Sequence, residues 1–121
     1  MLARAEAPWQ WQVVRADLDP AEGSEQAGVR PVLVVSRESV NTVLPVITIV
    51  TLTTRKNARR IYPTEALVPS GEGGLPSESI ALAHQIRTIS KNRVLGSYGW
   101  IENEPVREAV RESIRIHLDL S

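Results

Sequence analysis

The chain has 121 residues, of which 42% are hydrophobic and 23% charged, a composition that fits one globular core and argues against a disordered or membrane-spanning protein. Fourteen Lys and Arg balance fourteen Asp and Glu, which argues against coating of nucleic acid by an overall basic surface. Because the chain has no cysteine, disulfides, thiolate nucleophiles and Cys-based zinc sites are excluded.

We expect a single domain over residues 1–121, with residues 1–10 as a candidate flexible N-terminal extension. The first six residues carry charges and lack the apolar run of a secretion signal. We therefore expect a cytoplasmic protein without a membrane segment.

Most of the chain is predicted to be β structure. A first strand is expected over 12–18, and two runs rich in β-branched residues predict central strands over 31–36 and 46–52. Three shorter strands are expected further along, over 61–68, 79–83 and 94–100. Turn-forming residues predict three loops, over 19–28, 54–60 and 69–76. Several short strands with loops between them suggest a barrel or a sandwich.

The C-terminal stretch shows a different period. Apolar residues recur there every four positions, with charged residues between them, which predicts an amphipathic helix. Asn103 is its expected N-cap, and Pro105 is tolerated in a first turn. The apolar positions are Val106, Val110, Ile114 and Leu118.

Two segments in the first third, Asp17–Pro20 and Gly23–Pro31, together with the strand that follows, strongly resemble the signature of the MazF/PemK toxin family. Two later segments, Val50–Thr54 and Leu82–Ile89, match in the expected order, and the C-terminal helix fits as well. The resemblance implies a mainly β fold with a C-terminal α-helix, namely a small SH3-like β-barrel of the CcdB/PemK type.

The resemblance also implies a function. It implies a homodimeric toxin endoribonuclease that cleaves single-stranded messenger RNA sequence-selectively, without a metal ion or another cofactor, and that is neutralised by a cognate MazE-like antitoxin. The residues agree, since only His84 and His117 could ligate a metal through imidazole, and no HExxH or paired-carboxylate spacing accompanies them.

Cleavage by a ribose 2′-OH gives a 2′,3′-cyclic phosphate and a 5′-OH, and it needs a base, an acid and a cation for the added negative charge. The family resemblance associates Arg30 and Thr53 with this activity. Arg30 is always protonated and its fork matches phosphate oxygens, so it can stabilise the developing charge. Thr53, at the end of a predicted strand, would donate a hydrogen bond to the same phosphate.

Proton transfer is assigned to Glu25 or to His84, and the sequence leaves the choice open. Glu25 shares a predicted loop with Arg30, and the family resemblance makes it a candidate. At the position of His84 the PemK branch has an Asp that is thought to act as the base, but imidazole titrates near neutrality and can replace it. The plain alternatives are a solvated loop acid and a half-buried structural histidine.

RNA contacts are expected from a basic run and a few neighbours. Four cations fall within the six residues 55–60 without an acid, a pattern that is usually a solvated surface but would guide an RNA backbone beside a phosphate site. The three Trp residues are expected in core or dimer packing rather than in base stacking. The expected RNA-binding residues are Gln26, Arg55, Lys56, Arg59, Arg60, Gln85 and Arg87.

The sequence departs from the family pattern at three positions, and two rival functions stay open. Trp11 precedes Gln12 where many members have Gly-Asp, and Ser90 replaces an Asp, in addition to the change at His84. One rival is a CcdB-like gyrase-binding toxin without nuclease activity, since fold alone does not exclude it. The other is an inactive family member that only binds antitoxin.

Overall fold

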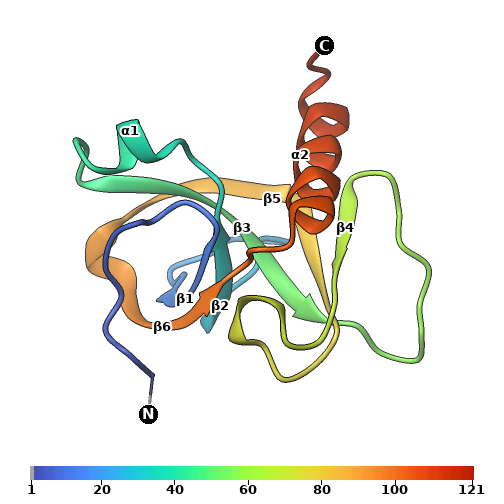
Figure 1. The fold of residues 1–121 in the computed structure, drawn as a ribbon, viewed down its shortest axis with the longest axis horizontal. Coiled ribbons are helices and arrows are strands. Elements are labelled where there is room, and N and C mark those ends of the chain that lie inside the picture. Colours follow the sequence, from blue (N-terminus) through green and yellow to red (C-terminus); the bar gives the residue numbers. More distant parts are fainter. Residues whose placement is uncertain (1) are drawn as a thin grey trace.

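The computed structural model describes residues 2–121, and its strands form one curled antiparallel sheet with a helix beside it (Figure 1). The strands are β1 (Gln12–Asp17), β2 (Val29–Val34), β3 (Val46–Thr54), β4 (Glu65–Val68), β5 (Ser79–Ser90) and β6 (Val94–Trp100). The helices are α1 (Glu38–Asn41) and α2 (Glu104–Leu118), with short 3-10 turns over Glu72–Gly74 and Lys91–Arg93. The mainly β fold with a C-terminal helix is confirmed.

The strand order is β4-β5-β3-β2-β1-β6. Every pairing is antiparallel, and the strands that are central in the sequence prediction, β2 and β3, lie in the middle of the sheet. Within residues 2–121, β4 and β6 remain as edges that do not pair with each other. The closed barrel that the resemblance implies is therefore not confirmed by the strand pairing.

Both faces of the sheet are buried, because successive side chains of a strand point to opposite faces. Val13 and Leu33 belong to a cluster that also holds Val106 and Val110 of α2. On the opposite face, Val14 and its neighbours on β2 and β3 form a second cluster, against which the half-buried Trp9 packs. The branched aliphatic residues of the sequence therefore build two layers of core, one on each side of the sheet.

Helix α2 begins as its sequence predicts. The side chain of Asn103 accepts a hydrogen bond from the backbone N–H of Val106 at 3.1 Å, which satisfies one of the free donors of the first turn. Val106 and Val110 are buried, Ile114 is half-buried, and Leu118 is exposed. The helix thus contacts the sheet through its first turns, and its last turn extends beyond it (Figure 1).

Trp11 is buried between the sheet and α2, with 5% of its surface exposed. Its φ of 70° lies in the left-handed region, which a glycine adopts without strain. The guanidinium carbons of Arg107 and Arg111 lie 5.4 and 5.0 Å from the centre of its ring. The departure from Gly at this position therefore places an aromatic ring under the helix, where it packs in the core and contacts two cations.

The segment before β1 lies along β6 and α1. Ala3 forms a β-bridge with Ser97 of β6. The carboxylate of Glu38 accepts hydrogen bonds from the backbone N–H groups of Trp9 and Gln10, both at 2.8 Å. Burial opposes ionisation of Glu38, but these N–H donors hold its pKa below the usual value. Residues 2–10 are thus tied to the domain at two places, and Met1 lies outside the described residues.

Three elements differ from the sequence prediction by more than two residues, while β2 is shifted by two from the strand predicted over 31–36. The fifth strand was predicted to end at Ala83 but runs to Ser90, because it pairs along nearly the whole of β3. The strand predicted over 61–68 is only β4, since the backbone turns just before it, with the N–H of Glu65 bonded to the carbonyl of Tyr62. Helix α1 was not predicted, and its N-cap residue Arg37 makes no side-chain cap.

No helix in the part of the chain that the structure describes is long and apolar enough to cross a membrane.

Candidate active site

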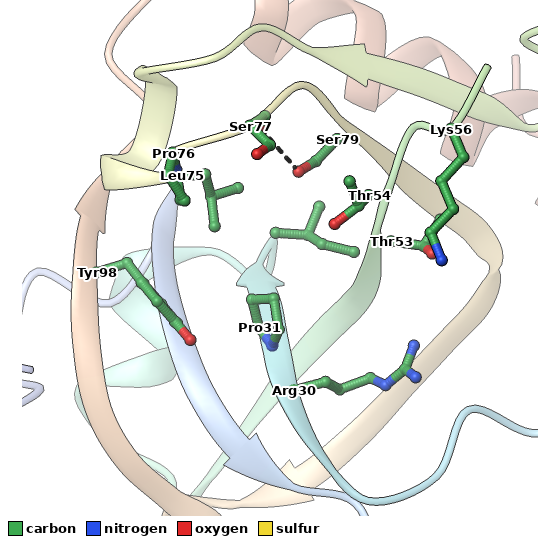
Figure 2. A pocket seen from close by; sticks show the side chains of 11 residues that line it. Arg30, Pro31, Thr53, Thr54, Lys56, Leu75, Pro76, Ser77, Ser79 and Tyr98 are labelled. Carbon is green, nitrogen blue, oxygen red and sulfur yellow. Dashed lines mark hydrogen bonds between the residues drawn. The ribbon is translucent and has the colours of Figure 1, made fainter. Parts of the chain in front are cut away.

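A pocket of about 370 Å³ opens where the start of β2 meets the end of β3 (Figure 2). Residues of β2, β3, β5 and β6 and of the two loops that flank β4 surround it. No Asp or Glu is among the described residues that line it. The lining residues are Arg30, Pro31, Leu52, Thr53, Thr54, Lys56, Leu75, Pro76, Ser77, Ser79 and Tyr98.

Arg30 is the second residue of β2, paired with Ala16 of β1. Its Nε donates a hydrogen bond to the carbonyl of Ala27 at 3.3 Å, which holds the half-buried side chain at the strand entrance. Within residues 2–121, no carboxylate lies at ion-pair distance from its guanidinium. Arg30 therefore brings an uncompensated positive charge to the pocket.

Thr53 lies one residue before the end of β3, where it pairs with Ile80 of β5. The pairing of β3 with β5 fixes the half-buried Thr53 in place, two residues beyond the last pair of β3 with β2 at Thr51. Figure 2 shows Thr53 beside the end of Lys56, with Arg30 extending to the same side of the pocket. The fold thus brings together the two residues that the resemblance associates with activity, although 22 positions separate them in the sequence.

The two sides of the pocket differ chemically (Figure 2). On one side lie the cations of Arg30 and Lys56 with the hydroxyl of Thr53. On the other side lie the ring of Tyr98 and the apolar side chains of Leu75 and Pro76. A ligand that carries an anion next to a flat apolar part would match both sides.

His84 and Gln85 lie on a bulge of β5. Ile49 of β3 pairs with Arg87 and Thr51 pairs with Leu82, so two steps along β3 correspond to five along β5. A bulge of this kind re-aims side chains and is frequent near active sites. His84 is exposed there and does not line the pocket.

Gln85 ties the loop between β1 and β2 to this bulge. Its Oε1 accepts from the N–H of Gln26 and its Nε2 donates to the carbonyl of Ser24, both at 3.1 Å. Between these two residues, Glu25 is exposed and its carboxylate accepts from the N–H of Glu22 at 2.8 Å. The two candidates for proton transfer therefore lie on segments that Gln85 joins, outside the pocket lining.

The basic run divides into cations with an acid partner and cations without one. Arg55 pairs with Glu78 at 3.1 Å, and Arg59 forms two bonds of 3.0 Å with Glu65. The Arg59 bond, together with the N–H of Tyr62, holds the pKa of Glu65 below its usual value although burial opposes this. Lys56 is the member of the run that lines the pocket.

The two remaining predicted RNA contacts are placed differently. The guanidinium carbon of Arg60 lies 5.1 Å from the centre of the Tyr62 ring, on the exposed loop. Arg87 of β5 donates to the carbonyl of Leu18 at 3.3 Å, which connects it to the loop that follows β1. Neither lines the pocket.

The apolar side of the pocket has no signal in the sequence. The loop over 69–76 was predicted, but nothing in its composition indicated that Leu75 and Pro76 would lie against the ends of β2 and β3. Tyr98 was assigned to a strand without a role. In residues 2–121, no group of three or more His, Asp or Glu side chains is placed so as to hold a metal ion.

Comparison with known proteins gives consistent matches. Residues 9–118 match the family described as PemK-like, MazF-like toxin of type II toxin–antitoxin systems. The endoribonuclease MazF of Staphylococcus saprophyticus subsp. saprophyticus is 34% identical over 108 residues, which cover 89% of this chain and 88% of that protein.

Two solved structures share the fold over nearly the full length. MazF from Deinococcus radiodurans has a TM-score of 0.79 at 25% identity, covering 96% of this chain and 100% of that one. An endoribonuclease from a mycobacterial species, solved in complex with its cognate antitoxin, has a TM-score of 0.77 at 25% identity, covering 95% of this chain and 98% of that one.

Proposed function

The chain belongs to the family of PemK-like, MazF-like toxins of type II toxin–antitoxin systems, and we propose that it is an endoribonuclease that cleaves single-stranded messenger RNA sequence-selectively without a metal ion. One observation carries the proposal. Arg30, which has no acid partner among residues 2–121, and Thr53 line the same pocket. A cation and a hydroxyl donor on one side of a pocket without carboxylates suit a phosphodiester.

In this proposal the ribose 2′-OH attacks the adjacent phosphorus, and the bond to the 5′ oxygen of the next nucleotide breaks. The guanidinium of Arg30 holds the phosphate oxygens as negative charge builds on them. Thr53 donates its hydroxyl hydrogen to the same phosphate, and Lys56 contacts the backbone nearby. The products are a 2′,3′-cyclic phosphate and a 5′-OH.

The 2′-OH proton goes to a base, and an acid protonates the leaving oxygen. We assign this transfer to Glu25 or His84, which lie on the segments that Gln85 joins. The pH dependence of cleavage separates the two: the substitution, His84→Gln or Glu25→Gln, that removes a limb of the parent's pH profile identifies the residue that transfers the proton.

We further propose that the protein is a cytoplasmic homodimer neutralised by a MazE-like antitoxin. The mycobacterial structure in complex with its antitoxin supports a partner of this kind. The pocket lining, with its cations and without carboxylates, suits an acidic flexible segment that folds as it binds.

The deciding experiment is incubation of the purified protein with mixed-sequence RNA in EDTA, followed by analysis of the product ends. We expect cleavage with 2′,3′-cyclic phosphate and 5′-OH ends, and sequencing of the 5′ ends gives the recognised motif. Cleavage by the folded protein that requires added Mg²⁺ would contradict the metal-independent mechanism. Binding to gyrase without any RNA cleavage would instead support the CcdB-like function.

A further inference from the structure

The proposed phosphate chemistry leaves the Tyr98 side of the pocket without a role. Tyr98 is the aromatic residue of the described lining, and it reaches in from β6, opposite the ends of Arg30 and Lys56 (Figure 2). Leu75 and Pro76 lie next to it in the same view. This side therefore presents an aromatic ring and apolar surface within reach of the phosphate side.

Two closely packed glycines fix the position of the loop that carries Leu75 and Pro76. Gly73 and Gly74 lie against β1 and β6, where a Cβ atom would come within 2.4 Å of Val13 Cγ2 and within 2.0 Å of the Tyr98 carbonyl oxygen, respectively. Both glycines have positive φ values, which other residues adopt only with strain. The loop therefore sits directly on the backbone of Tyr98.

Hydrogen bonds within the same loop hold the backbone of Leu75 and Pro76. The N–H of Gly71 donates to the carbonyl of Leu75 at 2.8 Å, and the hydroxyl of Ser70 donates to the carbonyl of Pro76 at 2.9 Å. Leu75 is 5% exposed and belongs to the core under α2. The apolar side is thus formed by the fold before any ligand arrives, which reduces the entropy lost on binding.

We propose that Tyr98, with Leu75 and Pro76, forms a subsite for the nucleobase of a nucleotide next to the scissile phosphate. The inference rests on the proposed function, because it takes the Arg30 side as the phosphate site. A nucleotide has an anionic part and a flat base with an apolar face, and these match the two sides of the pocket. The volume of about 370 Å³ lies within the range of about 300–1,000 Å³ typical of small-ligand sites.

Two hydroxyl groups near the apolar side, those of Ser77 and Tyr98, can distinguish one nucleobase from another. Ser77 lines the pocket beside Pro76, and the Tyr98 hydroxyl points into the cavity. Hydroxyl groups both donate and accept hydrogen bonds, so they can contact base edges while the ring stacks on the base face. Tyr98 is thus a substrate-binding residue that contributes to sequence preference.

The test compares Tyr98→Leu with Tyr98→Phe, and uses Leu95→Ala as the matched control. Leu95 is on the same strand, is 60% exposed and does not line the pocket. Binding is measured with a mixed-sequence 2′-O-methyl oligonucleotide, which cannot be cleaved, and cleavage is measured separately with RNA. Loss of a stacked base weakens binding by about 5- to 100-fold, so we expect that loss in Tyr98→Leu and less than about a 3-fold change in Leu95→Ala. Tyr98→Phe keeps the ring and loses only the hydroxyl, so it should bind more tightly than Tyr98→Leu and differ from the parent in its choice of cleavage sites.

The readouts separate this inference from the proposed function. If Tyr98→Leu binds the oligonucleotide as tightly as the parent protein and cuts at the same sites, the nucleobase subsite is wrong while the nuclease stands. If the parent binds, the variant loses binding and neither cuts RNA, the subsite stands and the nuclease assignment is wrong.

A second measurement needs no substitution. An oligonucleotide containing 4-thiouridine is photo-crosslinked to the parent protein and the crosslinked residues are mapped by mass spectrometry. We expect crosslinks at Tyr98 or Pro76. Crosslinks confined to the Arg30 side would overturn the proposal even if Tyr98→Leu does not fold.

Discussion

Two arginines of helix α2 lie beside acidic side chains, whereas the arginine of the pocket does not. On α2, Arg111 pairs with Glu104 at 2.6 Å and with Glu108 at 3.2 Å, and Arg115 pairs with Glu108 and Glu112. Acid partners cancel the charge of each guanidinium. In the pocket, Arg30 stands among hydroxyl and apolar side chains, and no carboxylate is among the described lining residues.

This difference in acid partners explains why a formal net charge of zero does not argue against an RNA substrate. The acidic residues near the C-terminus neutralise Arg111 and Arg115 of the helix, where exposed ion pairs add little stability. The cations at the pocket keep their charge, and a hollow lined by one sign of charge attracts the opposite sign. Local pairing, rather than overall balance, determines which surface attracts an anion.

The largest expected effect comes from removing the unpaired guanidinium. Arg30→Ala should lower the cleavage rate by about 100- to 1,000-fold, as for loss of one electrostatic donor at a developing charge. Because Arg30 forms no ion pair in residues 2–121, the melting temperature should change little. Single-turnover cleavage and thermal melting measure the two quantities.

Arg111→Ala is the matched control, since it removes a guanidinium that has acid partners. We expect cleavage within about 2-fold of the parent and a small loss of stability. Equal loss of cleavage in both variants would mean that pairing does not distinguish the two regions.

The next effect concerns the hydroxyl beside the cations. Thr53→Val keeps the shape and the branched Cβ of the strand but removes the donor, so cleavage should fall by about 10- to 100-fold. Thr88→Val is the control, because Thr88 is exposed on β5 and bonds to Thr48 at 2.8 Å, away from the pocket. Unchanged cleavage in Thr53→Val would remove Thr53 from the reaction.

A smaller effect is expected for the exposed cation of the pocket. Lys56→Ala should weaken RNA binding by about 3- to 10-fold at low salt and reduce the slope of log affinity against log salt by about 0.7, the value for one phosphate contact on a single strand. Binding titrations at several salt concentrations give the slope. Arg59, which pairs with Glu65, should show a smaller change in slope on substitution by Ala.

The smallest effect on activity is expected at Glu38, whose carboxylate accepts two backbone hydrogen bonds away from the pocket. Glu38 has a folded-state pKa below its unfolded value, so its contribution to stability is present above the unfolded pKa and is lost as the pH falls through the folded pKa. We expect the stability of the parent to fall more steeply than that of Glu38→Gln below about pH 4.5, with equal cleavage at neutral pH. Denaturant unfolding at several pH values measures this.

The control for that prediction is Glu6→Gln, because the Glu6 side chain is exposed. It should follow the parent at every pH. If Glu38→Gln also follows the parent, the N-terminal segment is held by contacts other than the Glu38 carboxylate.

The sequence predicted the elements whose pattern is local. The β-branched run over 46–52 predicted β3, and the spacing of Val106 and Val110 with the Asn103 cap predicted α2. Motif order also predicted that Arg30 and Thr53 would meet, and they line one pocket.

What the sequence did not predict depends on distant contacts. The second half of β5 is a strand because it pairs with β3. Its own residues mix polar and apolar types and therefore did not predict a strand. The position of Leu75 and Pro76 depends on the packing of Gly73 and Gly74 on β1 and β6. The sequence of a glycine-rich loop does not show which strand it will contact.

The bulge of β5 has a consequence for how this protein can change. Residues 83–86 have no partner on β3, so the side chain of His84 has no cross-strand neighbour there that limits its size or charge. Against the aspartate that the family resemblance implies for the PemK branch, the imidazole of His84 is such an exchange. The framework of the sheet is thus separate from a position that we propose for proton transfer, and that position can change while the framework is kept.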